Sequence, residues 1–161
     1  MRFIKKERDG MSYETWIIEG RGVRLTDVET SVERVEKLLE MEPEIRETVH
    51  AQIREQIGDP KAPTSLEDYE AYEFEEAGYS TGIGAILVAI IKKREGYELS
   101  VVDDFDGNQF LIFEKTYPWL MTSRCETGLT KGGLDEAISR YIKILTDKEI
   151  EVEYQRAENG G

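Results

Sequence analysis

Cysteine and histidine are nearly absent from the chain, which has 161 residues but only Cys125 and His50 of these two types. A single cysteine excludes an internal disulfide framework and a four-cysteine zinc cluster. An unpaired cysteine also fits a reducing compartment, where thiols stay unoxidised. We therefore expect a cytoplasmic protein without a structural zinc ion.

The sequence also lacks a long hydrophobic segment. Its longest apolar run, residues 83–91, is far shorter than the roughly 20 residues that a helix needs to cross a bilayer. The first six residues, MRFIKK, become charged at once and contain no apolar stretch typical of a secretory signal. We expect neither a membrane anchor nor a targeting segment.

Basic residues are in deficit. The chain has 21 Lys and Arg against 34 Asp and Glu, so its formal net charge is −13. Nucleic acids and anionic membranes carry the same sign of charge, which disfavours direct binding to either.

The hydrophobic share of 39% suffices for a core. The length fits one domain, which we expect over residues 1–156, with a flexible tail over residues 157–161.

The first half of the chain predicts strands followed by helices. Residues 12–18 are rich in β-branched and aromatic types, and Gly20-Arg21-Gly22 then offers a turn before a second short strand. A helix should carry the apolar positions Val28, Val32, Val35 and Leu39, with Thr26 or Asp27 as its cap. The next helix should begin near Pro43 and end before Gly58.

Residues 64–77 allow two interpretations. Ser65 followed three residues later by Asp68 resembles a capping box, which favours a helix through about Tyr72. The alternation in residues 72–75 is instead typical of a strand. We favour the helix.

The second half predicts a β-meander. Residues 83–91 are apolar on both faces, which suits a central strand at the core of the sheet. Residues 97–102 and 109–113 should form a hairpin around Asp106-Gly107, a helix should span residues 134–145, and residues 149–154 should form a last strand. The expected fold class is α+β, an antiparallel β-meander sheet with helices packed on one face.

Motifs for catalysis are weak. Thr81-Gly82-Ile83-Gly84 resembles a phosphate loop, but such a loop needs a helix after its glycines, and a strand is expected here. His50 lies beside the apolar stripe of its helix and belongs to no metal or nucleophile motif, and Cys125 has no partner motif either. We expect no enzymatic activity, no catalytic residues and no cofactor.

The cluster of carboxylates at residues 103–108 does not match a calcium loop. With Asp104 as the first ligand of an EF-hand, Gly107 would fall at position 4, whereas the loop needs its glycine at position 6. Lys115 would fall at position 12, where the loop needs a glutamate. Weak binding of a divalent ion stays open as an alternative. A hairpin turn at Asp106-Gly107 is the favoured interpretation.

The most distinctive feature is an acidic segment that contains aromatic residues. Residues 62–77 hold six acidic residues and no Lys or Arg. Such a run is often a solvated face, but interleaved aromatic residues are typical of a binding hot spot. The candidate partner-binding residues are Glu67, Asp68, Glu70, Tyr72, Glu73, Phe74, Glu75 and Glu76, together with Tyr117 and Trp119 of a Tyr-Pro-Trp loop. Trp119 is expected to anchor the partner or to plug the sheet.

The chain resembles small acidic accessory proteins of phages and bacterial mobile elements at three places: residues 103–108, Tyr117-Pro118-Trp119 and residues 144–147. The resemblance covers mainly residues 97–161. That group includes anti-CRISPR and anti-restriction inhibitors, some of which mimic nucleic acid. The resemblance implies a non-enzymatic inhibitor that occupies the basic groove of a nucleic-acid-binding protein, such as a defence nuclease. The alternative is a small metal- or ligand-responsive regulatory domain that uses the turn at residues 103–108.

Overall fold

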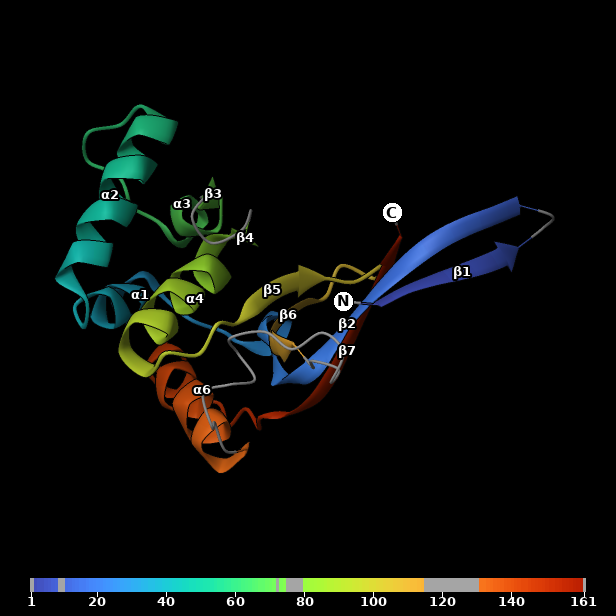
Figure 1. Cartoon of the computed structure of the whole chain (residues 1–161). Helices are drawn as coiled ribbons and strands as arrows, with labels where there is room; N and C mark the ends of the chain where they lie inside the picture. The colour runs from blue at the N-terminus through green and yellow to red at the C-terminus, as the bar shows by residue number, and fades with distance from the viewer. Residues whose placement is uncertain (1, 9–10, 72, 75–79, 115–130, 161) are drawn as a thin grey trace.

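The computed structural model describes residues 2–8, 11–71, 73–74, 80–114 and 131–160, and has the expected α+β architecture (Figure 1). Its strands are β1 (Arg2–Arg8), β2 (Met11–Arg24), β3 (Glu73–Phe74), β4 (Ser80–Thr81), β5 (Ser100–Asp103), β6 (Gln109–Glu114) and β7 (Glu153–Gly160). Its helices are the 3-10 turn η1 (Leu25–Asp27) and α1 (Val32–Leu39), α2 (Pro43–Ile57), α3 (Leu66–Glu70), α4 (Gly82–Glu95) and α6 (Lys131–Leu145).

The long strand β2 organises the sheet, in which every pairing is antiparallel. Its residues 11–17 pair with β1 and its residues 20–24 pair with β6, while residues 15–22 pair with β7. Because β7 overlaps both of the other pairings, β1 and β6 follow one another along one edge of β2 and β7 takes the opposite edge. The β1–β2 hairpin therefore extends beyond the rest of the sheet as a two-stranded ribbon, which points away from the helices (Figure 1).

Strands β7, β2, β6 and β5 curl so that the outer two meet. The backbone N–H of Phe105, just after β5, donates to the carbonyl of Glu158 in β7 at 3.1 Å, and the Asn159 side chain donates to the carbonyl of Asp103 at 2.8 Å. Each of the four strands contributes to a small apolar cluster, formed by Ile18, Val102, Phe110, Ile112 and Ala157. The sheet is thus a partly closed roll with its own minor core.

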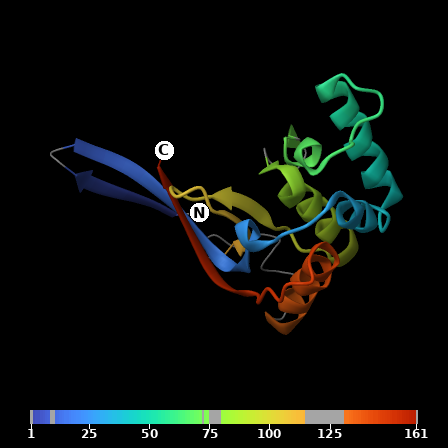
Figure 2. The same ribbon diagram turned by 180° about the vertical axis from the view of Figure 1, so that it is seen from behind.

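The helices pack on one side of the sheet, as both views show (Figures 1 and 2). Helix α4 lies at the centre of the main core, which also includes buried residues of α1, α2, α3 and α6 and, from the sheet, Val23 and Leu111. Only its C-terminal turn is charged. There Arg94 pairs with Glu42 at the start of α2, and Glu95 accepts hydrogen bonds from Arg140 and Tyr141 of α6.

The prediction that residues 83–91 form the central strand is wrong, because they form most of helix α4. A run that is apolar on every side is compatible with a strand covered on both faces and with a helix covered all round, and periodicity does not separate the two. The covering helices decide the outcome here, since buried residues from four other helices surround α4. The run is in the core, as expected, but not in the sheet.

The predicted turn at Gly20-Arg21-Gly22 is also wrong, because β2 continues through it to Arg24. The glycine at position 22 has a packing role. A Cβ atom there would lie 2.0 Å from the carbonyl oxygen of Leu111, so only glycine lets β2 and β6 approach this closely.

Residues 157–160 form the end of β7 and not a flexible tail. Ala157 is fully buried in the minor core, and residues 157–160 pair with residues 15–18 of β2. The last strand also begins at Glu153, four residues later than the prediction of a strand from residue 149.

Other predicted elements are confirmed with small shifts in their ends. Helix α2 begins at Pro43 and ends at Ile57, directly before Gly58, whose φ of 77° is left-handed. Helix α1 begins later than expected, with Ser31 as its cap, because residues 25–27 form η1. The β5–β6 hairpin turns through Gly107 (φ 79°), and α6 covers the expected residues. Within the described part of the chain, no helix is both long enough and apolar enough to cross a membrane.

Replacing Leu87 by alanine should destabilise the protein by about 2–5 kcal/mol, because Leu87 is fully buried in the middle of α4 and its removal leaves a cavity. The exposed Lys92 on the same helix provides the control, and Lys92→Ala should change the free energy of unfolding by less than about 0.5 kcal/mol. Urea unfolding followed by circular dichroism measures both. Equal effects of the two substitutions would contradict the central position of α4.

Ending the chain after Arg156 should lower the stability by about 2 kcal/mol, or roughly 5 °C in melting temperature for a chain of this size. The truncation removes buried Ala157 and the strand pairs of residues 157–160. Removing residue 161 alone is the control and should have no effect. A long truncation that melts with the full chain would restore the flexible-tail interpretation.

Candidate protein-interaction surface

Helix α3 begins with a complete capping box, as the spacing of Ser65 and Asp68 predicts. The Ser65 hydroxyl accepts a hydrogen bond from the Asp68 backbone N–H, and the Asp68 carboxylate accepts from the backbone N–H of Ser65 at 3.2 Å. The same carboxylate accepts from the backbone N–H of Thr64 at 2.7 Å. These hydrogen bonds hold the pKa of Asp68 below its usual value. Asp68 therefore starts the helix, and its expected contact with a partner stays a prediction.

The inner side of α3 is fixed by a polar cluster that joins three helices. Tyr69 is fully buried, and its hydroxyl donates to Oε1 of Glu36 on α1. The same oxygen lies 2.7 Å from Nε2 of buried His50 on α2, and Arg46 Nε donates to the other carboxylate oxygen at 3.1 Å. We call Glu36, Arg46, His50 and Tyr69 the Glu36 cluster. In this cluster His50 makes a structural contact.

The hydrogen bonds of the Glu36 cluster favour the ionised form of the Glu36 carboxyl. Partial burial raises the pKa of this carboxyl, but hydrogen bonds from Tyr69, His50 and Arg46 outweigh burial, and the net pKa is lowered. The pKa of Tyr69 is raised, first by burial and then by its hydrogen bond to the Glu36 carboxylate. Both shifts favour the same state, an ionised glutamate that accepts a hydrogen bond from a neutral tyrosine.

The outer side of α3 presents Glu67 and Glu70, both exposed. Among the residues that the structure describes, neither carboxylate has an ion-pair partner, in contrast to Glu36 and Glu42. Unpaired exposed charges keep their full field toward solvent, within the Debye length. The two residues are thus available to attract a basic partner.

The remaining predicted contact residues are only partly placed. Glu73 and Phe74 form β3, the next element after α3 in the chain, and β3 pairs with β4. Tyr72, Glu75, Glu76, Tyr117 and Trp119 lie outside the described residues, as does the choice between a plug and an anchor for Trp119. We use the name α3 surface for Glu67, Glu70 and the backbone of β3.

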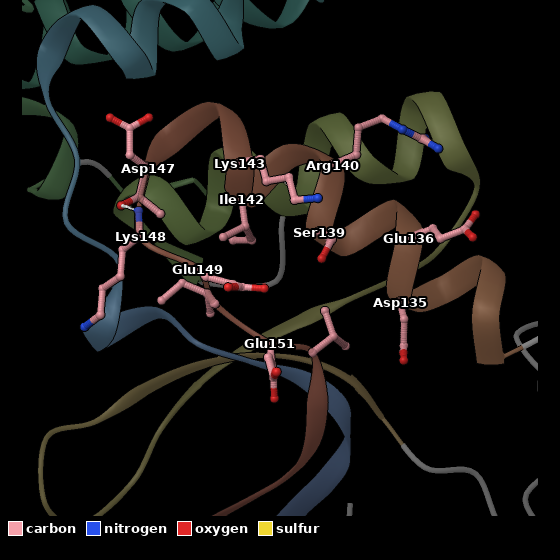
Figure 3. Close-up of a pocket in the computed structure, with 13 residues that line it drawn as sticks. Asp135, Glu136, Ser139, Arg140, Ile142, Lys143, Asp147, Lys148, Glu149 and Glu151 are labelled. Atoms are coloured by element: carbon pink, nitrogen blue, oxygen red, sulfur yellow. Dashed lines mark hydrogen bonds between the residues drawn. The ribbon is translucent and has the colours of Figure 1, made fainter.

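A larger groove lies elsewhere, between α6 and the segment that leads to β7 (Figure 3). Ser139 and Glu149 point into it, and its wall carries both Lys143 and Glu136 (Figure 3). Asp135 at its margin is held by Arg21 of β2, with Nη2 to Oδ2 at 2.5 Å. Side chains of both signs give this groove no preference for a partner of one charge, unlike the α3 surface.

The turn at residues 103–108 uses its central carboxylate internally. Asp104 Oδ1 accepts hydrogen bonds from the backbone N–H groups of Asp106 and Asn108, each at 2.9 Å, and Oδ2 accepts from the Asn108 side chain. These bonds lower the pKa of Asp104, with the Asn108 side chain as the largest cause. Within the described ranges, no group of three or more His, Cys, Asp or Glu side chains could hold a metal ion.

The Glu36 cluster escaped the sequence analysis, although one signal was present. His50 lies beside the apolar stripe of its helix, which predicts a residue at the flank of the helix. A buried histidine must find a hydrogen-bond partner, which makes a glutamate on a neighbouring helix an expected contact. Which glutamate this is depends on how α1 packs against α2, and local sequence does not predict that packing.

Comparisons with known proteins give no match: no family model, no curated protein and no solved structure resembles this chain.

Acid should destabilise the protein through Glu36. Because the pKa of Glu36 is lower in the folded state than its ordinary value of 4.5, its contribution to stability is present above that value and is lost as the pH falls through the folded pKa. In Glu36→Gln this part of the acid dependence should disappear. Urea unfolding between pH 7 and pH 3 measures the slope, with Glu33→Gln, an exposed site on the same helix, as control. Identical slopes for wild type and Glu36→Gln would contradict the role assigned to the cluster.

Proposed function

We propose that this protein is a non-enzymatic acidic interaction protein that inhibits a basic, nucleic-acid-binding partner by occupying its basic groove. A defence nuclease of the CRISPR or restriction type is the partner class that the sequence resemblance suggests. The observation that supports the proposal is the construction of α3. A short helix with an internally satisfied cap and a buried anchor presents two unpaired carboxylates to solvent.

Rigidity matters for such a surface because ordering a flexible segment on binding costs free energy. Five-residue helices are too short to be stable alone. Tyr69 and the capping box hold α3 in place before any partner arrives. The helix positions that carry Glu67 and Glu70 are therefore preorganised for a basic groove.

Charge supports the same partner class. A chain of net charge −13 is repelled by nucleic acid, but it is attracted to proteins that bind nucleic acid. The acidic run continues in the sequence past α3, through Glu73, Glu75 and Glu76, without a basic residue. Such a concentration of one sign of charge steers association and selects basic partners.

The alternative function, a metal-responsive regulatory domain, has less support. Both oxygens of Asp104 already accept hydrogen bonds within the turn that would bind the ion. A metal would have to displace these bonds. The acidic-inhibitor proposal needs no such rearrangement of the described residues.

Reversing the charge of the α3 surface should abolish partner capture. Immobilised wild-type protein is incubated with a bacterial lysate at low salt, in parallel with the double variant Glu67→Lys/Glu70→Lys. The variant should lose the partner, because several weak exposed pairs and the steered approach fail together. The same captured protein should elute from wild type as salt rises and should be displaced by duplex DNA.

The double variant Glu136→Lys/Glu151→Lys is the matched control. It makes the same change in net charge at exposed sites beside the α6 groove, and it should retain the partner. Asp68 is left unchanged because its substitution would remove the helix cap. If both variants lose the partner equally, net charge alone explains the capture and the α3 surface has no specific role. If both variants retain the partner, the proposal is contradicted.

A further inference from the structure

A cavity of about 370 Å³ lies where the C-terminal end of α3 meets the start of α4. Its wall also includes η1, the loop that follows η1, and the β5–β6 hairpin. Glu70 of the α3 surface and Asp103 at the end of β5 both line it, and its described lining residues include no Lys or Arg. The cavity is therefore continuous with the α3 surface and shares its sign of charge.

The glycines at the start of α4 shape this cavity. Gly82 has a φ of 66°, and a Cβ atom at Gly84 would lie 2.9 Å from the Val101 side chain. They follow strand β4 and open a helix, an arrangement that sequence analysis had excluded when it placed a strand after them. The first N–H groups of a helix attract anions in general.

An anion is nevertheless a poor occupant here. The carbonyl oxygens of Tyr69 and Glu70, at the end of α3, lie next to Gly82 and offset the positive end of α4. The carboxylates of Glu70 and Asp103 add two negative charges to the wall. The balance of charge favours a cationic group.

Thr30 also lines the cavity, although its hydroxyl is not on the cavity surface in this structure. Its hydroxyl is buried and has no hydrogen-bond partner, the only such side-chain atom among the described residues. A buried hydroxyl without a partner costs free energy, so an unpaired one calls for an explanation. The Thr30 residue as a whole is partly exposed. A rotation about χ1 to another staggered rotamer would place its hydroxyl where its methyl group now lies.

We propose that this cavity receives the guanidinium group of an arginine side chain presented by the partner protein. Arginine carries five N–H donors in a planar fork, which suits acceptors that are spread over a wall. The acceptors on residues that line the cavity are the carboxylates of Glu70 and Asp103, the side-chain oxygen of Gln109 and, after the χ1 rotation, the hydroxyl of Thr30. This inference rests on the proposed function, because the arginine belongs to the partner that the α3 surface attracts.

The test uses the full chain and N-acetyl-arginine amide as the probe, followed by backbone amide NMR. Saturable shifts are expected at Gly82, Gly84 and Gly107, which line the cavity. N-acetyl-citrulline amide has nearly the same shape without the charge and should produce none. Binding of the probe should weaken at least threefold in Thr30→Val and in Asp103→Asn.

Asp106→Asn is the matched control, since it removes one exposed carboxylate from the same turn without being part of the cavity wall. It should bind the probe like wild type. Equal binding of the citrulline probe, or equal weakening in Asp103→Asn and Asp106→Asn, would overturn the inference. So would unchanged binding in Thr30→Val, a variant that keeps the shape of the side chain.

Neither Thr30 nor Asp103 belongs to the α3 surface, so the two proposals fail separately. If Glu67→Lys/Glu70→Lys loses the captured partner while Thr30→Val and Asp103→Asn retain the wild-type affinity for it, the cavity inference is wrong and the proposed function stands. If the arginine probe binds the cavity but no partner depends on the α3 surface, the proposed function is wrong and the cavity is confirmed as a guanidinium site.

Discussion

The burial of α4 is the constraint on which the rest of the structure depends. A helix that is apolar on every side has no face to offer to water, so other elements must surround it. Helices α1, α2, α3 and α6 do so together with one face of the sheet. The charges of α4 itself are consequently restricted to its last turn, where Arg94 and Glu95 bind the neighbouring helices.

One charged group is partly enclosed in that shell, and it sets the position of α3. Taking a carboxylate out of water is costly unless hydrogen bonds replace the lost solvation. Glu36 receives them from three residues on two other helices. A group that needs all of its partners tolerates few alternative packings, which is why a five-residue helix has one orientation. The polarity of α3 then follows, with Tyr69 inward and Glu67 and Glu70 outward.

Local signals in the sequence predicted those elements whose ends depend on local chemistry. Pro43 and Gly58 bound α2, Ser65 and Asp68 start α3, and Gly107 turns the β5–β6 hairpin, each through backbone geometry or a short-range hydrogen bond. Failures occurred where tertiary contacts decide. Residues 83–91 predict a strand because the covering helices are not visible in the run itself. Gly22 predicts a turn because the residue that requires a glycine there, Leu111, is 89 positions away. The candidate surface was predicted in part: Glu67 and Glu70 are exposed as expected, whereas Asp68 is consumed by the cap and the Glu36 cluster was missed.

Strand β2 has β1 and β6 along one edge and β7 along the other. Strands β1 and β7 come from opposite ends of the chain, and this has a consequence for how the protein is made. Strand β1 adjoins β2 in the sequence, but β7 is separated from it by more than a hundred residues and completes the roll. Closing so long a loop is entropically expensive and slows the formation of sheet structure. During synthesis, β2 therefore emerges from the ribosome long before β7, the strand on its other edge, exists. One edge of the central strand stays open until residue 160 has been added, and in that interval the nascent chain depends on its helices, or on a chaperone, to keep that edge from pairing with another molecule.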